Sequence, residues 1–467
     1  MNHDVVVIGA GVSGLSCAQD LMARGLDVKV LERQVTTGGN AKSSTFDGFL
    51  MEHGPTTMNA AFPNAMARIS ALGLDAAARP LGPNVRKRYL RDENGLHGIS
   101  AHPMGFFTSG YLSPIERASM LAEFLRPRKS GGTDETIHQF AARRFGKGFA
   151  DKVIEPMAAG IFMGDSKTLS ISGAFPKLVE LEQRHGSIIR GILAAKRGSE
   201  PGRNLLSWDG GIGTLPQTQT RLLGPRIETG VTVTKITRNP AGFVVATANS
   251  GTVTARALVL AVQPHVAAAL LEPLDPITAK AAAEISAPPI SVVYLGYRRE
   301  QVAHPLNGLG FLSTKSGGQA ISGAQFCSTM FAGRAPANHV SVACYVGGSR
   351  NPDLTRLPER DLSNLIEQEL AGLLGIKGIP VVARIQHWPR GLPHYTIGHQ
   401  ARRDTIESAH LRLPGLYLTG NYLAGVSLVN CLEAAHNTTE KVAASLLGQQ
   451  DLRQADPERI RQSNYRG

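Results

Sequence analysis

The chain of 467 residues is 42% hydrophobic and 18% charged, a composition that excludes an intrinsically disordered protein and allows several domains. The four cysteines are scattered without a CxxC pair, which argues against a disulfide framework or a zinc site and favours a reducing cytoplasm. The formal net charge of +12 is uneven, because residues 79–203 hold twenty Lys and Arg against twelve Asp and Glu. Such a surplus favours membrane lipid, nucleic acid or an acidic small molecule as partner; a solvated basic face is the alternative.

The first residues have the pattern of a strand, a glycine turn and a helix. Residues 4–10 form a short β-branched run, and Gly9, Gly11 and Gly14 follow at GxGxxG spacing. Apolar residues at helical spacing then continue to Gly25, where a helix C-terminus favours glycine. Such glycines permit a tight turn, the close approach of a pyrophosphate and close helix packing. The segment therefore predicts a dinucleotide site.

A second strand at residues 27–31 strengthens this prediction, because it ends at an acid, Glu32. An acid at this position accepts hydrogen bonds from ribose hydroxyls, and its charge disfavours a 2′-phosphate. A glycine pair, Gly38 and Gly39, follows the acid. This pair favours a second contact with the cofactor; an ordinary loop is the alternative.

Further along the chain, helical and strand patterns alternate in long blocks. Residues 79–202 are mostly helical in pattern, as in "SPIERASMLAEFLR" and "ETIHQFAARRFG". Strand patterns return at residues 230–236, 242–247 and 255–262, and again between residues 290 and 382. No internal repeat or low-complexity linker separates the blocks, so we expect interleaved domains. The first residues lack a signal-peptide pattern and no long apolar run occurs, so we expect neither secretion nor a membrane span.

Several stretches resemble known flavoenzymes. "TTGGNAKSS" followed by "FDGFLMEHGP" is similar to the amine-oxidase and phytoene-desaturase group, although Thr36 and Thr37 stand where an arginine often precedes the glycine pair. Four more stretches resemble oxygen-dependent protoporphyrinogen oxidases: "IFMGDSKTLSISGAFPKLVELEQRHGSII", "CSTMFAGRAP" followed by "YVGGSRNPDL", "WPRGLPHYTIGH" and "GLYLTGNYLAGVSLVNCLEAAH". The resemblance spans about residues 5–447.

The resemblance implies an α/β fold with a discontinuous Rossmann-like FAD domain, a mixed-sheet substrate domain and an inserted helical membrane-binding domain. The implied FAD domain comprises residues 1–78, 203–265 and 385–450, with part of the substrate wall near 50–78. The implied helical domain comprises residues 79–202 and the substrate domain residues 266–384, and a polar tail covers 451–467.

FAD is the implied cofactor, and its implied contacts are Gly9, Ala10, Gly11, Val12, Ser13, Gly14, Glu32, Arg33, Gly38, Gly39, Asn40, Gly54, Pro55, Thr56, Thr57, Val233, Trp388, Gly420, Val426, Ser427 and Leu428. The helix that begins near Ser427 would stabilise negative charge on the reduced flavin. Leu312 and Phe331 are implied substrate-wall residues, and Lys315 an implied partner of a substrate carboxylate; ordinary core or loop roles are the alternatives. We identify no catalytic acid or base and no metal site, and we expect His394 and His399 to be structural.

The implied reaction is the conversion of protoporphyrinogen IX to protoporphyrin IX in haem biosynthesis, by six-electron hydride removal with oxygen as acceptor. Alternatives are coproporphyrinogen III as substrate, another enzyme of this fold such as a carotenoid desaturase or an amine oxidase, and a non-catalytic porphyrin carrier. The stretch "GFFTSGYLSPIERASMLAEFLRPRK" predicts peripheral contact with the cytoplasmic face of a membrane. Without a nucleic-acid motif we expect no nucleic-acid partner, and a homodimer stays open.

Overall fold

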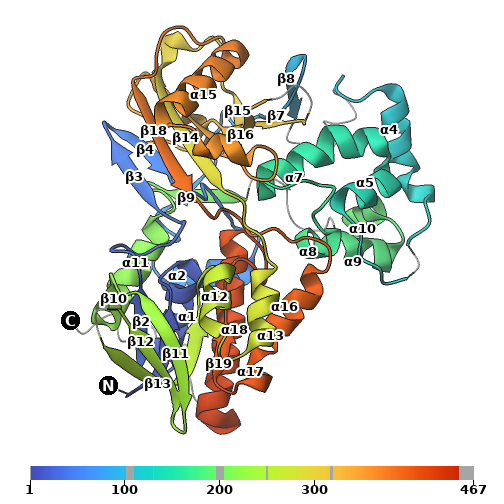
Figure 1. Ribbon diagram of the computed structural model, residues 1–467. Coiled ribbons are helices and arrows are strands. Elements are labelled where there is room, and N and C mark those ends of the chain that lie inside the picture. The colour runs from blue at the N-terminus through green and yellow to red at the C-terminus, as the bar shows by residue number, and fades with distance from the viewer. Residues whose placement is uncertain are drawn as a thin grey trace.

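The structure is a computed structural model that describes residues 2–100, 110–129, 131–195, 204–248, 251–315 and 319–451. Figure 1 shows one sheet with its helices around the two chain termini, a second sheet above it, and a group of helices to one side. The protein is therefore a mixed α/β fold with two multistranded sheets, as the sequence predicts. The polar tail from residue 452 onward lies outside the described residues.

The first sheet has seven strands in the order β10-β2-β1-β13-β12-β11, with β19 also paired to β13. The strands are β1 (Asn2–Ile8), β2 (Val28–Glu32), β10 (Ile227–Thr229), β11 (Val233–Asn239), β12 (Gly242–Thr247), β13 (Thr252–Leu260) and β19 (Leu416–Leu418). β13 pairs in parallel with β1 and β19, and antiparallel with β12. Val6 and Ile8 enter one buried cluster, and Val5 and Val7 enter another. Both faces of β1 are thus covered, which explains its continuous apolar run.

Helices cover both faces of the first sheet. The helices of this half are α1 (Val12–Ala23), α2 (Pro63–Ala71), α11 (Thr214–Leu223), η3 (Gly224–Arg226), α12 (Pro264–Leu271), α13 (Pro276–Ala283), α16 (His399–Glu407), α17 (Ala409–Arg412) and α18 (Leu428–Asp451). Residues 266–285 were expected in the substrate domain. Instead, Ala267 and Ala282 pack in the same cluster as Val6, because alanine-rich helix faces fit closely against a sheet.

The second sheet has the order β18-β14-β17-β16-β15-β7-β8. Its strands are β7 (Lys87–Asp92), β8 (Gly95–Ser100), β14 (Ile290–Arg298), β15 (Gly308–Ser313), β16 (Ile321–Gln325), β17 (His339–Gly347) and β18 (Val382–Trp388). The short helices η4 (Arg299–Gln301), α14 (Cys327–Met330) and η5 (Pro352–Arg356) connect these strands, and α15 (Glu359–Leu374) packs on one face. Small strands complete the fold: the pair β3 (Ser43–Phe46) and β4 (Phe49–Glu52), and the sheet of β5 (Met58–Asn59), β9 (Leu205–Trp208) and β6 (Ala78–Pro80).

Three features of this sheet differ from the sequence-based expectation. Residues 87–100 form β7 and β8, although we expected the helical segment to begin at residue 79. Residues 385–388 belong to β18, which pairs with β14, rather than to the first sheet. Residues 359–374 form a helix within a region of strand pattern. In each case hydrogen bonding or packing with partners distant in the chain decides the outcome, and local pattern cannot report these partners.

The third body, which we call the helical cluster, consists of the helices between residues 114 and 195. They are α4 (Pro114–Leu121), η1 (Ala122–Leu125), α5 (Ile137–Phe145), α6 (Lys147–Phe149), η2 (Ala150–Ile154), α7 (Glu155–Phe162), α8 (Ile171–Ala174), α9 (Pro176–His185) and α10 (Ile188–Ala195). Arg144 and Glu123 form an ion pair that is completely buried among these helices. In the part of the chain that the structure describes, no helix is long and apolar enough to cross a membrane.

Candidate functional site

The glycine loop between β1 and α1 is closed on one side and open on the other. Gly9 has φ +102°, and a Cβ there would lie 2.5 Å from the carbonyl oxygen of Ala261. A Cβ on Gly14 would lie 1.9 Å from the carbonyl oxygen of Gly9. A Cβ on Gly11, by contrast, would meet only the Cα of Gly39, at 3.9 Å. Gly9 and Gly14 therefore serve backbone packing, whereas Gly11 leaves space beside the start of α1.

The glycine pair Gly38 and Gly39 lies against this loop. Gly38 forms a β-bridge with Gly11, and its N–H donates to the carbonyl of Ala10 at 2.8 Å. The Glu32 carboxylate accepts from the N–H of Ala10 at 2.7 Å and from that of Gln34 at 2.8 Å. Each carboxylate oxygen keeps a further lone pair. The glycine pair and Glu32 therefore lie together at the glycine loop, and their contacts with a cofactor stay predictions.

These features fit a dinucleotide. No side chain among the described residues caps the N-terminus of α1, so its first N–H groups stay available to phosphate oxygens. The N–H of Val231 donates to the carbonyl of Glu32 at 2.9 Å, which brings the start of β11, with Val233, beside the same acid. FAD would be held here by the glycine loop, the α1 N-terminus and Glu32.

Lys42 is a residue at this loop that the sequence reasoning missed. Thr36 and Thr37 replace the arginine often found before the glycine pair, and Lys42 Nζ donates to Thr36 Oγ1 at 2.8 Å. It also donates to Gln34 Oε1 at 2.6 Å. Burial lowers the pKa of Lys42, while Glu32 opposes that shift. A cation therefore reaches the loop from three residues beyond Gly39, a position that a search confined to the GxGxxG motif does not cover.

The turn at residues 54–57, which we call the cofactor turn, is fixed from two sides. A Cβ on Gly54 would lie 2.7 Å from the carbonyl oxygen of Asn40. The turn therefore packs directly on the backbone that follows the glycine pair. On the other side, Trp388 Nε1 donates to the carbonyl of His53 at 2.7 Å. The His53 ring hydrogen-bonds to Gln386 Oε1 at 2.8 Å. The indole thus connects the end of β18 in the second sheet to the cofactor turn.

The start of α18 completes this junction. Ser427 Oγ accepts from the N–H of Asn430 at 3.2 Å, so Ser427 caps the helix. Leu428 shares a buried cluster with Val12 at the start of α1 and Met58 after the cofactor turn. Three segments implied to bind the flavin therefore meet in one place. Gly420, eight residues before the helix, has φ +154° and lies against the ring of Tyr422.

The two histidines of "WPRGLPHYTIGH" have structural partners. His394 Nε2 hydrogen-bonds to the carbonyl of Phe162 at 3.1 Å. The His399 ring stacks on Tyr395 with 4.2 Å between centroids and 19° between planes. Burial lowers the pKa of His399 to about 4, so the ring is neutral at physiological pH. The Tyr395 hydroxyl donates to the carbonyl of Asn421.

The three implied substrate residues make contacts with different parts of the fold. Leu312 in β15 packs against Gly160 of α7. Phe331 is buried after α14, with the Arg334 guanidinium 5.3 Å from its ring centroid. Lys315 lies in a cleft of about 320 Å³ between the second sheet and the helical cluster. No described contact joins these three side chains, and their substrate roles stay predictions.

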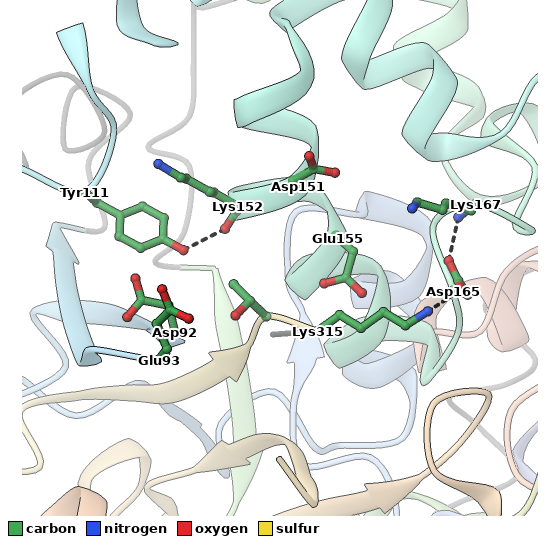
Figure 2. Close-up of a pocket in the computed structure, with 10 residues that line it drawn as sticks. Asp92, Glu93, Tyr111, Asp151, Lys152, Glu155, Asp165, Lys167 and Lys315 are labelled. Atoms are coloured by element: carbon green, nitrogen blue, oxygen red, sulfur yellow. Dashed lines mark hydrogen bonds and ion pairs between the residues drawn. The ribbon is translucent and has the colours of Figure 1, made fainter. Parts of the chain in front are cut away.

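Figure 2 shows that Lys315 extends below Glu155 toward Asp165, and its ammonium lies 3.2 Å from the Asp165 carboxylate. The cleft is lined by five carboxylates and three lysines. Lys152 also has an acidic partner, Glu116, at 2.9 Å. The cleft is thus net acidic, which makes it a poor environment for the carboxylate of a substrate.

The sequence analysis did not identify two further candidates for the substrate wall, Arg88 and Tyr345. Arg88 in β7 is exposed and shares a strand face with Leu90, whose register partner in β15 is Leu312. Tyr345 in β17 donates to Gln325 Oε1 at 3.0 Å and lies beside Thr56 of the cofactor turn. Neither "KRYLR" nor "VACYVGG" alternates between polar and apolar residues, so the sequence pattern carries no signal for the face that either side chain takes.

Residues 12–443 match the protein family described as flavin-containing amine oxidoreductase. The chain belongs to this family. A chloroplastic protoporphyrinogen oxidase of Nicotiana tabacum is 29% identical over 95% of this chain and 86% of its own length. A coproporphyrinogen III oxidase of Bacillus subtilis is 24% identical over 92% of this chain and 95% of its own. A solved structure from Exiguobacterium, provisionally named a protoporphyrinogen oxidase, has a TM-score of 0.82 at 23% identity and covers 96% of this chain and 99% of that chain.

Family membership confirms the predicted FAD cofactor and an oxidoreductase as the class of enzyme. The predicted similarity to protoporphyrinogen oxidases is confirmed as well. The individual cofactor contacts and the substrate stay predictions.

Trp388→Ala should weaken FAD binding by roughly tenfold, because it removes a part-buried hydrogen bond to the carbonyl of His53, next to the cofactor turn, together with the packing of the indole. FAD titration of the apoprotein measures this effect.

The His394→Ala and His399→Ala variants should keep their FAD and lose only part of their turnover. Abolished turnover at full FAD content in either histidine variant would restore a catalytic role for that ring.

Proposed function

We propose that the protein is an FAD-dependent protoporphyrinogen oxidase that forms protoporphyrin IX with oxygen as the acceptor. The observation that carries this proposal is the junction at which the glycine loop, the cofactor turn, Trp388 and the start of α18 meet beside the second sheet. The similarity to the Nicotiana tabacum enzyme along nearly the whole chain supports the same reaction.

Bound at this junction, FAD supplies the two-electron acceptor for a reaction that removes six electrons from the macrocycle in total. The tasks left to the chain are to orient the macrocycle, to exclude water and to hold the carboxylates of the substrate. The N-terminus of α18, capped by Ser427, directs a positive dipole end toward the junction. The His394 ring is held by a hydrogen bond and the His399 ring by stacking. The proposal therefore needs no protein acid or base at these positions.

The propionates of the substrate need a cation, and we propose Arg88 for this role in preference to Lys315. Lys315 is 63% exposed on its side chain and already paired with Asp165, whereas no carboxylate in the described ranges forms an ion pair with Arg88. Arg88 also stands on the strand face of Leu90, and Leu90 is the register partner of the implied wall residue Leu312. A guanidinium can bind a carboxylate through two parallel hydrogen bonds.

The same chemistry on coproporphyrinogen III is the second candidate. The similarity to the Bacillus subtilis coproporphyrinogen III oxidase supports it. That substrate carries two additional propionates and therefore needs more unpaired cations.

Membrane contact through the helical cluster is a further part of the proposal. The side chains of Ile115 and Leu125 are more than 80% exposed, at 82% and 84%, and Leu193 is 58% exposed. Arg190 of α10 lies 6.0 Å from the Phe124 ring, beside Leu125. Exposed aliphatic side chains with basic neighbours are typical of peripheral attachment to an anionic bilayer.

The porphyrinogen assay tests the function. Holoprotein in air should form fluorescent porphyrin from protoporphyrinogen IX faster than from coproporphyrinogen III, after subtraction of the rate without protein. Activity on coproporphyrinogen III alone would replace the first proposal with the second. Anaerobic flavin bleaching by an amine or a polyene, and by neither porphyrinogen, would favour another enzyme of the same fold, and bound porphyrin without flavin reduction would indicate a carrier.

Arg88→Ala should raise KM for the porphyrinogen roughly tenfold or more with a smaller change in kcat, because a charge-assisted hydrogen bond to the substrate is lost. Arg88→Lys should give an intermediate KM. Lys315→Ala, the matched control, should change KM by about twofold at most, because an exposed ion pair contributes little. A larger effect at Lys315 than at Arg88 would reverse the assignment.

Leu125→Glu should reduce co-sedimentation of the protein with vesicles of phosphatidylglycerol and phosphatidylcholine, because it places a negative charge at the contact. Ile379→Glu alters an equally exposed side chain, 80%, before β18 in the second sheet and serves as control. Equal loss of binding in both variants, or in neither, would contradict attachment through the helical cluster.

A further inference from the structure

A buried arginine connects the second sheet to the small sheet beside the cofactor turn. Arg334 is 2% exposed. Its carbonyl oxygen accepts from the Tyr294 hydroxyl at 3.0 Å and the Ser341 hydroxyl at 3.2 Å, both in the second sheet. It also accepts from the N–H of Leu50 in β4 at 3.3 Å. One backbone carbonyl therefore joins β14, β17 and β4.

The guanidinium of Arg334 extends to β9 and the loop after it. It donates to Ser207 Oγ at 2.7 Å, to the carbonyl of Trp208 at 3.0 Å and to that of Asp209 at 3.3 Å. The same guanidinium lies 5.3 Å from the ring centroid of Phe331, the implied aromatic wall residue. The guanidinium thus contacts both β9 and the Phe331 ring.

The partner of this arginine is Glu52 at the end of β4, which is 4% exposed. Glu52 Oε1 lies 3.5 Å from Arg334 Nη2 and accepts from the N–H of Ile212 at 3.0 Å. Glu52 Oε2 accepts from the Ser43 hydroxyl. Glu52 directly precedes His53, the residue whose carbonyl receives the Trp388 indole N–H.

Moving two charged groups out of water costs free energy that their attraction offsets only in part. A buried ion pair is therefore weak evidence for a purely stabilising role. Its position is more informative, because Glu52 lies two residues before the cofactor turn and Arg334 contacts the Phe331 ring. We infer that Glu52 and Arg334 are positioning residues that set the cofactor turn relative to the aromatic wall. The inference rests on the proposed function, since it assigns Phe331 to the substrate side of the junction. Holding reacting partners in register is worth large factors in rate, and a displacement of about 1 Å can cost about a hundredfold.

Glu52→Gln and Arg334→Lys test the pair in the FAD-loaded protein. Burial raises the pKa of Glu52 to about 7, so the measurements are made well above that pH, where the wild-type carboxylate is charged. Both variants should bind FAD with an altered visible circular dichroism spectrum of the flavin. Their anaerobic rate of flavin reduction by protoporphyrinogen IX should fall roughly tenfold or more, with KM changed far less.

Glu369→Gln is the matched control. Glu369 pairs with Arg91 and accepts from the N–H groups of Ala320 at 2.9 Å and Ile321 at 3.2 Å, so it is also a shielded carboxylate with one arginine and backbone donors. It lies in α15, away from the cofactor turn. Its substitution should lower Tm yet leave the flavin spectrum and the reduction rate unchanged.

The readouts separate the two proposals. If neither porphyrinogen reduces the wild-type flavin, the proposed function fails, and the circular dichroism spectrum still decides the positioning role. Wild-type flavin spectra in Glu52→Gln and Arg334→Lys, or the same spectral change in Glu369→Gln, would overturn the inference. So would wild-type reduction rates in both variants, where the porphyrinogen is a substrate.

Discussion

The first sheet and the glycine loop depend on the close contact of three backbone segments, at Gly9, Gly14 and Ala261. Any side chain at Gly9 would overlap the Ala261 carbonyl, and any at Gly14 would overlap the Gly9 carbonyl. Because Ala261 follows β13, this contact also joins the first strand of the chain to one that arrives some 250 residues later. The N-terminus of α1 can then stand at the end of both strands, where its first N–H groups are available to an anion such as a phosphate.

The second sheet is positioned against this site by a few polar contacts. Trp388 donates to the carbonyl of His53, and Arg334 reaches from the second sheet to β9. Hydrogen bonds of this kind have fixed lengths and directions, whereas apolar packing tolerates small shifts. They therefore give the cofactor turn a defined position between the two sheets.

Charge is distributed differently on the two sides of the helical cluster. Toward the second sheet, lysines of the cleft are matched by carboxylates, as Lys315 is by Asp165. Inside the cluster, Arg144 is satisfied by Glu123. The apolar side chains that protrude, such as Ile115 and Leu125, belong to α4 and η1. Basic surplus in the sequence of this segment thus does not make the cleft basic.

The sequence by itself determined the glycine loop. GxGxxG, Glu32 and the glycine pair act through local backbone geometry that few other residues permit. The sequence also predicted five of the seven strands of the first sheet, all but the short β10 and β19, and most helices between residues 114 and 195, since their periodicity is strong. Only the tertiary structure decided that β7 and β8 join the second sheet, that Lys315 is neutralised by Asp165, and that Trp388, Glu52 and Arg334 meet around one turn. Those outcomes depend on contacts between residues far apart in the chain, and a local pattern carries no information about which distant partner a side chain will meet.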